Sequence, residues 1–137
     1  MQDHVALIII RDNKTLFVRR SLKKKALPGL WAFASGTIEM GETPLQTAKR
    51  EVKEELNLDL KSGKVIAVED LAEMKTRLHF VVCEVLSGEP TICEPDEIEE
   101  FAWMNFNEFF HKFSDDQIGH GLIWLRANPK IWQAYNL

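Results

Sequence analysis

The sequence contains few cysteines and no excess of basic charge. Cys83 and Cys93 are the only cysteines, and they show neither zinc-ligand spacing nor a C-x-x-C redox motif. We therefore expect both residues to be ordinary thiols in a reducing cytosol. The protein is accordingly expected to be cytoplasmic. The formal net charge of -4 argues against a protein that coats DNA, so no DNA partner is expected. A local basic patch could still bind a phosphorylated ligand.

Long apolar runs are also absent. No segment is long and apolar enough to cross a membrane, no signal peptide is recognisable, and we expect no membrane partner. Internal repeats, linkers and low-complexity segments are missing as well. The 137 residues are 45% hydrophobic and 28% charged. This composition predicts a single domain, residues 1–137, with room for a hydrophobic core.

Residues 44–57 predict a helix with recognisable ends. Thr43 is a suitable N-cap, Pro44 suits the first helical position, and Gln46 completes a capping box with Thr43. Asn57 is a plausible left-handed stop, because Asn is the usual substitute for Gly at that position.

This helix would place several carboxylates together beside a buried face. An apolar stripe faces the core, and Glu51, Glu54 and Glu55 stack next to it. Like charges at this spacing destabilise a helix, so their convergence suggests a missing cation. Oxygen ligands of this kind suit Mg²⁺ (or Mn²⁺). The alternative is a solvated acidic face.

The carboxylates lie within a longer pattern. Residues 36–58 resemble the Nudix box, G-x5-E-x7-R-E-U-x-E-E-x-G-U, where U is apolar. The matching residues are Gly36, Glu42, Arg50, Glu51, Val52, Glu54, Glu55 and Leu58. Only Asn57 departs, where the family usually has Gly, and Asn tolerates the left-handed conformation. The chain is therefore identified as similar to the MutT-like Nudix hydrolases.

This resemblance implies a fold and a metal site. The fold would be α/β (α+β): a mixed β-sheet sandwiched between α-helices. Glu54 and Glu55 would ligate metal, Glu51 would be a ligand or the general base, and Gly36 would add its carbonyl. Arg50 would orient a box carboxylate, with Glu51 as the expected partner, and Glu42 would brace the loop against the helix. From a later acidic loop, Glu97 would be a further ligand or base, with Glu94 and Glu100 as alternatives.

A basic cluster precedes the box. It comprises Arg19, Arg20, Lys23, Lys24 and Lys25. One interpretation is a solvated loop, and the other is a phosphate clamp, since Arg donates bidentate hydrogen bonds to phosphate. In the family an Arg at the end of the second strand often contacts substrate. Arg20 is therefore our first candidate for substrate binding and Arg19 the second, although the sequence leaves the strand parity open.

The remaining elements follow from local patterns. Strands are predicted over residues 4–10, 15–20, 30–34, 64–74, 76–86 and 101–104. A short helix is expected over 108–112, capped by Asn105 or Asn107. A longer helix is expected from Ser114 to about Ala127, with a last turn in residues 130–136. The first strand is apolar throughout, which indicates a central strand buried on both faces.

By resemblance, the activity would be metal-dependent hydrolysis of a nucleoside diphosphate linked to another group, X. The short chain and its box favour enzymes that convert dNTPs or NTPs, some oxidised, to the monophosphate and pyrophosphate. ADP-ribose, nucleotide sugars and coenzyme A are alternatives; no Pro occurs between Pro44 and Pro90, which counts against the usual ADP-ribose signature. A non-catalytic nucleotide-binding regulatory module is an alternative of another class. An isomerase-like enzyme would need a cysteine that residues 30–36 lack. A homodimer is possible.

Overall fold

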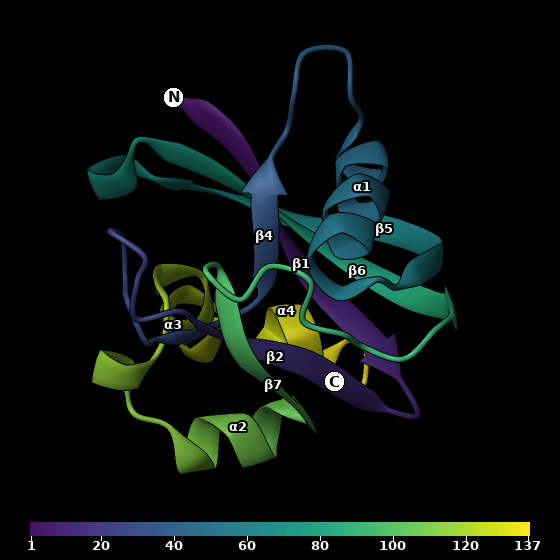
Figure 1. Ribbon diagram of the computed structural model, residues 1–137. Coiled ribbons are helices and arrows are strands. Elements are labelled where there is room, and N and C mark those ends of the chain that lie inside the picture. Colours follow the sequence, from purple (N-terminus) through teal and green to yellow (C-terminus); the bar gives the residue numbers. More distant parts are fainter.

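The computed structural model describes all residues, 1–137, and has a mixed seven-stranded sheet between helices (Figure 1). The strands are β1 (Gln2–Arg11), β2 (Lys14–Arg20), β3 (Trp31–Ala32), β4 (Ala34–Thr37), β5 (Asp59–Leu71), β6 (Thr76–Ser87) and β7 (Ile98–Met104). The helices are α1 (Pro44–Leu56), α2 (Phe106–Lys112), α3 (His120–Ala127) and α4 (Pro129–Gln133), with short 3-10 turns at Ala72–Met74 and Asp115–Gln117. This is the predicted α+β sandwich.

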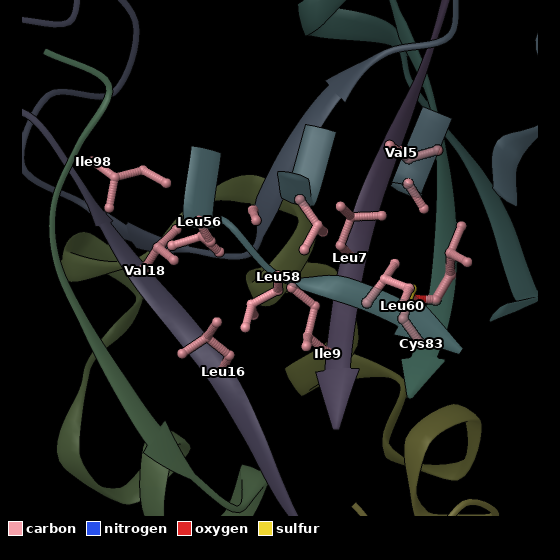
Figure 2. Close-up of a cluster of buried hydrophobic side chains, with 14 residues drawn as sticks. Val5, Leu7, Ile9, Leu16, Val18, Leu56, Leu58, Leu60, Cys83 and Ile98 are labelled. Carbon is pink, nitrogen blue, oxygen red and sulfur yellow. The ribbon is translucent and has the colours of Figure 1, made fainter. Parts of the chain in front are cut away.

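Strand β1 is the centre of the sheet and contributes to both cores. The main strand order is β3-β2-β1-β6-β5, with β1 and β6 parallel. Because side chains alternate along a strand, Val5, Leu7 and Ile9 pack under α1, whereas Ala6 and Ile8 pack against the C-terminal helices. Figure 2 shows the first core, where side chains of β1, β2 and the end of α1 point toward one another. The prediction of a central strand buried on both faces is confirmed.

The sheet opens on one side of β1. Residues 4–7 of β1 pair with β4, whereas its last residues, 10 and 11, pair with β2. Strand β2 then continues away, paired with β3 and β7. Strands β4 and β2 therefore separate (Figure 1). Residues of both strands line a cavity.

Several predicted boundaries were wrong. The strand predicted over 30–34 is two strands, β3 and β4, because its halves pair with β2 and β1 respectively. The strand predicted over 64–74 begins at Asp59 and ends at Leu71. The strand predicted over 101–104 begins earlier, at Ile98, which pairs with Arg20. The helix capped by Asn105 begins at Phe106.

The predicted helix from Ser114 to Ala127 is interrupted. Ile118 is extended, is 1% exposed in the second core, and forms a bridge with Trp31. The next backbone N–H, that of Gly119, donates to the Trp31 carbonyl at 2.9 Å. Burial of Ile118 and this pairing with β3 end the first turn, so α3 starts only at His120. No helix of the protein is both long and apolar enough to cross a membrane.

Candidate active site

Helix α1 is held at both ends as the sequence predicts. The Thr43 hydroxyl accepts a hydrogen bond from the Gln46 backbone N–H at 3.2 Å, and the Gln46 side chain accepts from the Thr43 N–H at 2.8 Å. Asn57 is left-handed, with φ of 55°, and its N–H donates to the Lys53 carbonyl. These caps satisfy backbone groups at both helix ends, and they fix where the carboxylates of α1 lie.

Arg50 ties the loop before α1 to the helix. Its Nε and Nη2 donate to the two oxygens of Glu42, each at 2.8 Å, and Nη2 also donates to the Thr37 carbonyl at 3.2 Å. Nη1 donates to Glu51 Oε1 at 2.8 Å. The guanidinium therefore reaches Glu51, the expected partner, while its bidentate bond goes to Glu42. These hydrogen bonds, with one from the Glu39 N–H, lower the pKa of Glu42 to about 2.

Gly36 leaves room for the Glu51 side chain. A Cβ atom built on Gly36 would lie 2.3 Å from Glu51 Cδ and 2.5 Å from Glu51 Oε1. Only glycine allows β4 to approach the carboxylate this closely, so the absence of a side chain at residue 36 is a structural requirement. The sequence suggested a role for the Gly36 carbonyl but not this contact.

Glu55 has a buried carboxylate oxygen without a hydrogen-bond partner in the protein. Its residue is 9% exposed, and its Oε2 is buried without a hydrogen-bond partner. Burial, with smaller effects of Glu51, Glu94 and Glu97, raises the pKa of Glu55 to about 8. A buried oxygen among other carboxylates is costly unless a cation compensates it, and carboxylate oxygens are ligands that suit Mg²⁺ or Mn²⁺. These residues therefore fit a divalent ion.

The other predicted metal ligands line the same cavity as Glu55. The cavity, of about 500 Å³, is lined by the side chains of Glu51, Glu54, Glu55 and Glu97 and by Gly36. Glu54 is half-exposed and approaches Arg50 at 3.7 Å. No three His, Cys, Asp or Glu side chains are arranged to hold a metal ion. The carboxylates of Glu51 and Glu97 pair instead with Arg50 and Lys24 respectively.

The acidic loop before β7 contributes two carboxylates to this cavity. Glu97 and Glu94 both line it. The third candidate, Glu100, lies on β7 opposite Arg19, with which it pairs at 3.5 Å, and it does not line the cavity. The Cys93 N–H, just before this loop, donates to the backbone carbonyl of Glu55 at 3.0 Å. Because Glu55 belongs to α1, this hydrogen bond attaches the loop directly to the helix.

The structure separates the two arginines that the sequence nominated. Arg20 lines the cavity, with Nε and Nη2 donating to the Ala26 carbonyl at 3.1 and 2.9 Å. Arg19 is not part of the lining; its Nε donates to the Gly29 carbonyl at 3.0 Å and it pairs with Glu99 and Glu100. Alternation along β2 sends neighbouring side chains to opposite faces.

Sequence reasoning did not single out Lys24, which lies in the site. Its ammonium bonds to Glu97, and its side chain lines the same cavity as the box carboxylates. Three consecutive lysines in a loop give no periodicity, so the sequence contained no signal that distinguished Lys24 from its neighbours.

Part of the cavity lining is apolar. Leu71, Leu78 and Leu122 line it, together with the imidazoles of His4 and His120. Burial lowers the pKa of His4, which favours the neutral form of its ring. The cavity lining thus combines charged residues with apolar residues and two histidines.

Known proteins of one family resemble this chain. A family model described as the NUDIX domain matches residues 1–123. The chain belongs to the Nudix hydrolase family. A nucleoside triphosphatase, NudI of Salmonella arizonae, is 26% identical over 116 residues, covering 77% of this chain and 82% of NudI. The CTP pyrophosphohydrolase of Escherichia coli K12 is 39% identical over 67 residues, covering 49% of each protein.

Solved Nudix structures share the fold. A Nudix hydrolase from Nitrosomonas europaea superposes with a TM-score of 0.76 at 19% identity, covering 98% of this chain and 90% of that one. At this identity the likeness shows the fold alone. The fold is therefore that of Nudix hydrolases.

Proposed function

We propose that this Nudix protein is a metal-dependent pyrophosphohydrolase that converts a nucleoside triphosphate, or a modified one, to the monophosphate and pyrophosphate. The observation that carries the proposal is the buried, unpaired Oε2 of Glu55. This oxygen lies among carboxylates in a cavity that also receives the positive charges of Arg20 and Lys24. Such a site suits a divalent ion together with a polyphosphate.

The residues have separate roles in this proposal. Glu51, Glu54, Glu55 and Glu97, with the Gly36 carbonyl, would hold Mg²⁺ or Mn²⁺. A bound divalent ion supplies polarisation of a phosphoryl oxygen and a lower pKa for bound water. Arg50 keeps the Glu51 carboxylate in position through its 2.8 Å hydrogen bond.

Glu51 or Glu97 would accept the proton from the attacking water. Arg20 would bind a phosphate through Nη1, because its Nε and Nη2 donate to the Ala26 carbonyl. These side chains thus divide proton transfer and phosphate binding between them.

Nucleoside triphosphates are the favoured substrate class. The cavity of about 500 Å³ has the size of a site for one small ligand, and the apolar residues in its lining suit a flat base. The names of NudI and of the CTP pyrophosphohydrolase agree with this class. ADP-ribose, nucleotide sugars and coenzyme A are the alternative substrates.

A hydrolysis screen tests the proposal. Purified protein with Mg²⁺ is assayed against dNTPs, oxidised NTPs, ADP-ribose, sugar nucleotides and coenzyme A, and the products are identified by chromatography. We expect nucleoside triphosphates to be cleaved to monophosphate and pyrophosphate. Glu54→Gln should abolish turnover, whereas Glu89→Gln, an exposed carboxylate outside the cavity, should not.

Two results would change the conclusion. Turnover of another substrate in the screen would keep the metal site and replace the substrate class. Nucleotide binding without any turnover would favour a regulatory module. The proton acceptor is tested separately, by pH–rate profiles of Glu51→Gln and Glu97→Gln; an unchanged rate in both would refute this assignment.

A further inference from the structure

Lys24 occupies a position that none of the other lysines shares. Of the three consecutive lysines 23–25, only Lys24 lines the cavity that contains the box carboxylates. Its side chain is 24% exposed and its ammonium bonds to Glu97. Lys23 pairs with Asp96 at 3.1 Å, but both side chains are 78% exposed. The Lys24–Glu97 pair therefore belongs to the site, and the Lys23–Asp96 pair belongs to the surface.

The backbone around Lys24 is fixed relative to Glu97. The Ser21 N–H donates to the Glu97 carbonyl at 2.9 Å, and the Lys24 N–H donates to the Ser21 carbonyl at 3.1 Å. These bonds connect the loop after β2 to the acidic loop before β7. The base of the Lys24 side chain is thus held near Glu97, while its four-carbon stem leaves the ammonium free to change partners.

The other cation in the cavity is less free to move. Two nitrogens of Arg20 already donate to the Ala26 carbonyl. A flexible ammonium whose present partner is a single carboxylate is better placed to respond to a ligand. Lys24 is therefore the cationic side chain of the cavity with the fewest constraints on its charged end.

We propose that Lys24 is a counter-cation that exchanges Glu97 for a substrate phosphate. Without ligands, its ammonium neutralises Glu97. When a divalent ion takes the Glu97 carboxylate, the ammonium is released and turns to the phosphate oxygens that arrive with the metal. This inference rests on the proposed function, since it needs the metal and a polyphosphate in this cavity.

Removal of Lys24 should change the affinities for metal and for nucleotide in opposite directions. Lys24 competes with the metal for Glu97, so its removal should strengthen metal binding. Lys24 also contributes a charge-assisted bond to phosphate, so its removal should weaken nucleotide binding. Loss of loop structure alone would weaken both, which makes the two effects separable.

The first measurement is Mn²⁺ binding without nucleotide, followed by electron paramagnetic resonance. Lys24→Met should bind Mn²⁺ about two- to fivefold more tightly than wild type, the range expected for loss of a partly exposed ion pair. Lys23→Met is the matched control and should differ by less than about twofold. Equal or weaker binding in Lys24→Met would overturn the exchange.

The second measurement is calorimetric titration of α,β-methylene-ATP in the presence of Mg²⁺. Lys24→Met should bind this analogue about tenfold more weakly, the usual effect of losing a bond between charged groups. Lys24→Arg should restore most of the affinity, because it keeps the charge. The phosphate-binding role of Lys24 would be refuted if Lys24→Met bound the analogue as tightly as wild type. It would also be refuted if Lys23→Met lost as much affinity as Lys24→Met.

Failure of the proposed function would look different. If wild-type protein bound no Mn²⁺, or if Glu54→Gln and Glu55→Gln left Mn²⁺ binding unchanged, the metal site itself would be refuted. If Mn²⁺ bound through those glutamates but Lys24→Met bound it like wild type, only the exchange would be refuted.

Discussion

Replacement of Gly36 by alanine should separate catalysis from folding. The new Cβ would lie 2.3 Å from Glu51 Cδ and 2.4 Å from Glu51 Cγ, whereas ordinary contacts begin at 3.4 Å. The Glu51 carboxylate must therefore move by about 1 Å, and a displacement of that size in an active site can lower the rate about 100-fold. We expect kcat/KM for the best substrate of the screen to fall by about that factor.

The loss of folding stability should be modest. A shift of Glu51 breaks one hydrogen bond to Arg50, which keeps its bonds to Glu42 and Thr37. One charge-assisted bond contributes about 1.5–3 kcal/mol. The lower backbone entropy of unfolded alanine offsets about 0.4–1 kcal/mol of this, because Gly36 does not have a positive φ. Urea unfolding should thus show a net loss of about 1–2 kcal/mol.

Gly119→Ala is the control. Gly119 lines the same cavity, but a Cβ there would lie 3.6 Å from Ala32 Cβ and 3.8 Å from the Trp31 carbonyl, both ordinary contacts. Its stability should stay within about 0.5 kcal/mol of wild type. If Gly36→Ala kept the kcat/KM of the wild-type protein, the position of Glu51 would not depend on the absence of a side chain at residue 36, and the reasoning would be refuted.

Three further changes test the supports of α1. Arg50→Met should lower the free energy of unfolding in urea by about 2–3 kcal/mol, because Glu42 and Glu51 lose a shared partner; a change below about 0.5 kcal/mol would contradict this. Asn57→Ala should cost about 1–2 kcal/mol at φ 55°, whereas Asn57→Gly should be nearly neutral; equal costs for both would exclude conformational strain as the cause. Glu42 has a pKa of about 2 in the folded protein, below its ordinary 4.5. Its ionised carboxylate therefore contributes fully to the free energy of unfolding above pH 4.5, and this contribution is lost as the pH falls toward 2. Glu42→Gln should flatten the stability profile in that interval, with the exposed Glu89→Gln as control; an unchanged slope would rule out this linkage.

Local patterns in the sequence predicted α1 well. Its capping box, its left-handed stop and its buried stripe depend on residues within a few positions of one another, and each is present in the structure. The prediction that the first strand is buried on both faces also holds, because side chains of β1 alternate between the two cores. Less regular segments were predicted less well. Ile118 interrupts the predicted C-terminal helix because it pairs with Trp31, which is distant in sequence.

The sequence by itself determined the helix, the spacing of its carboxylates and the resemblance to the Nudix family, because a helix converts spacing directly into a shared face. Only the tertiary structure decided which cations meet those carboxylates. It brought Arg20 and Lys24 into the cavity and left Arg19 outside, and it placed Glu51 against Gly36. These relations depend on strand parity and on loops joined across the fold, and no local pattern specifies either.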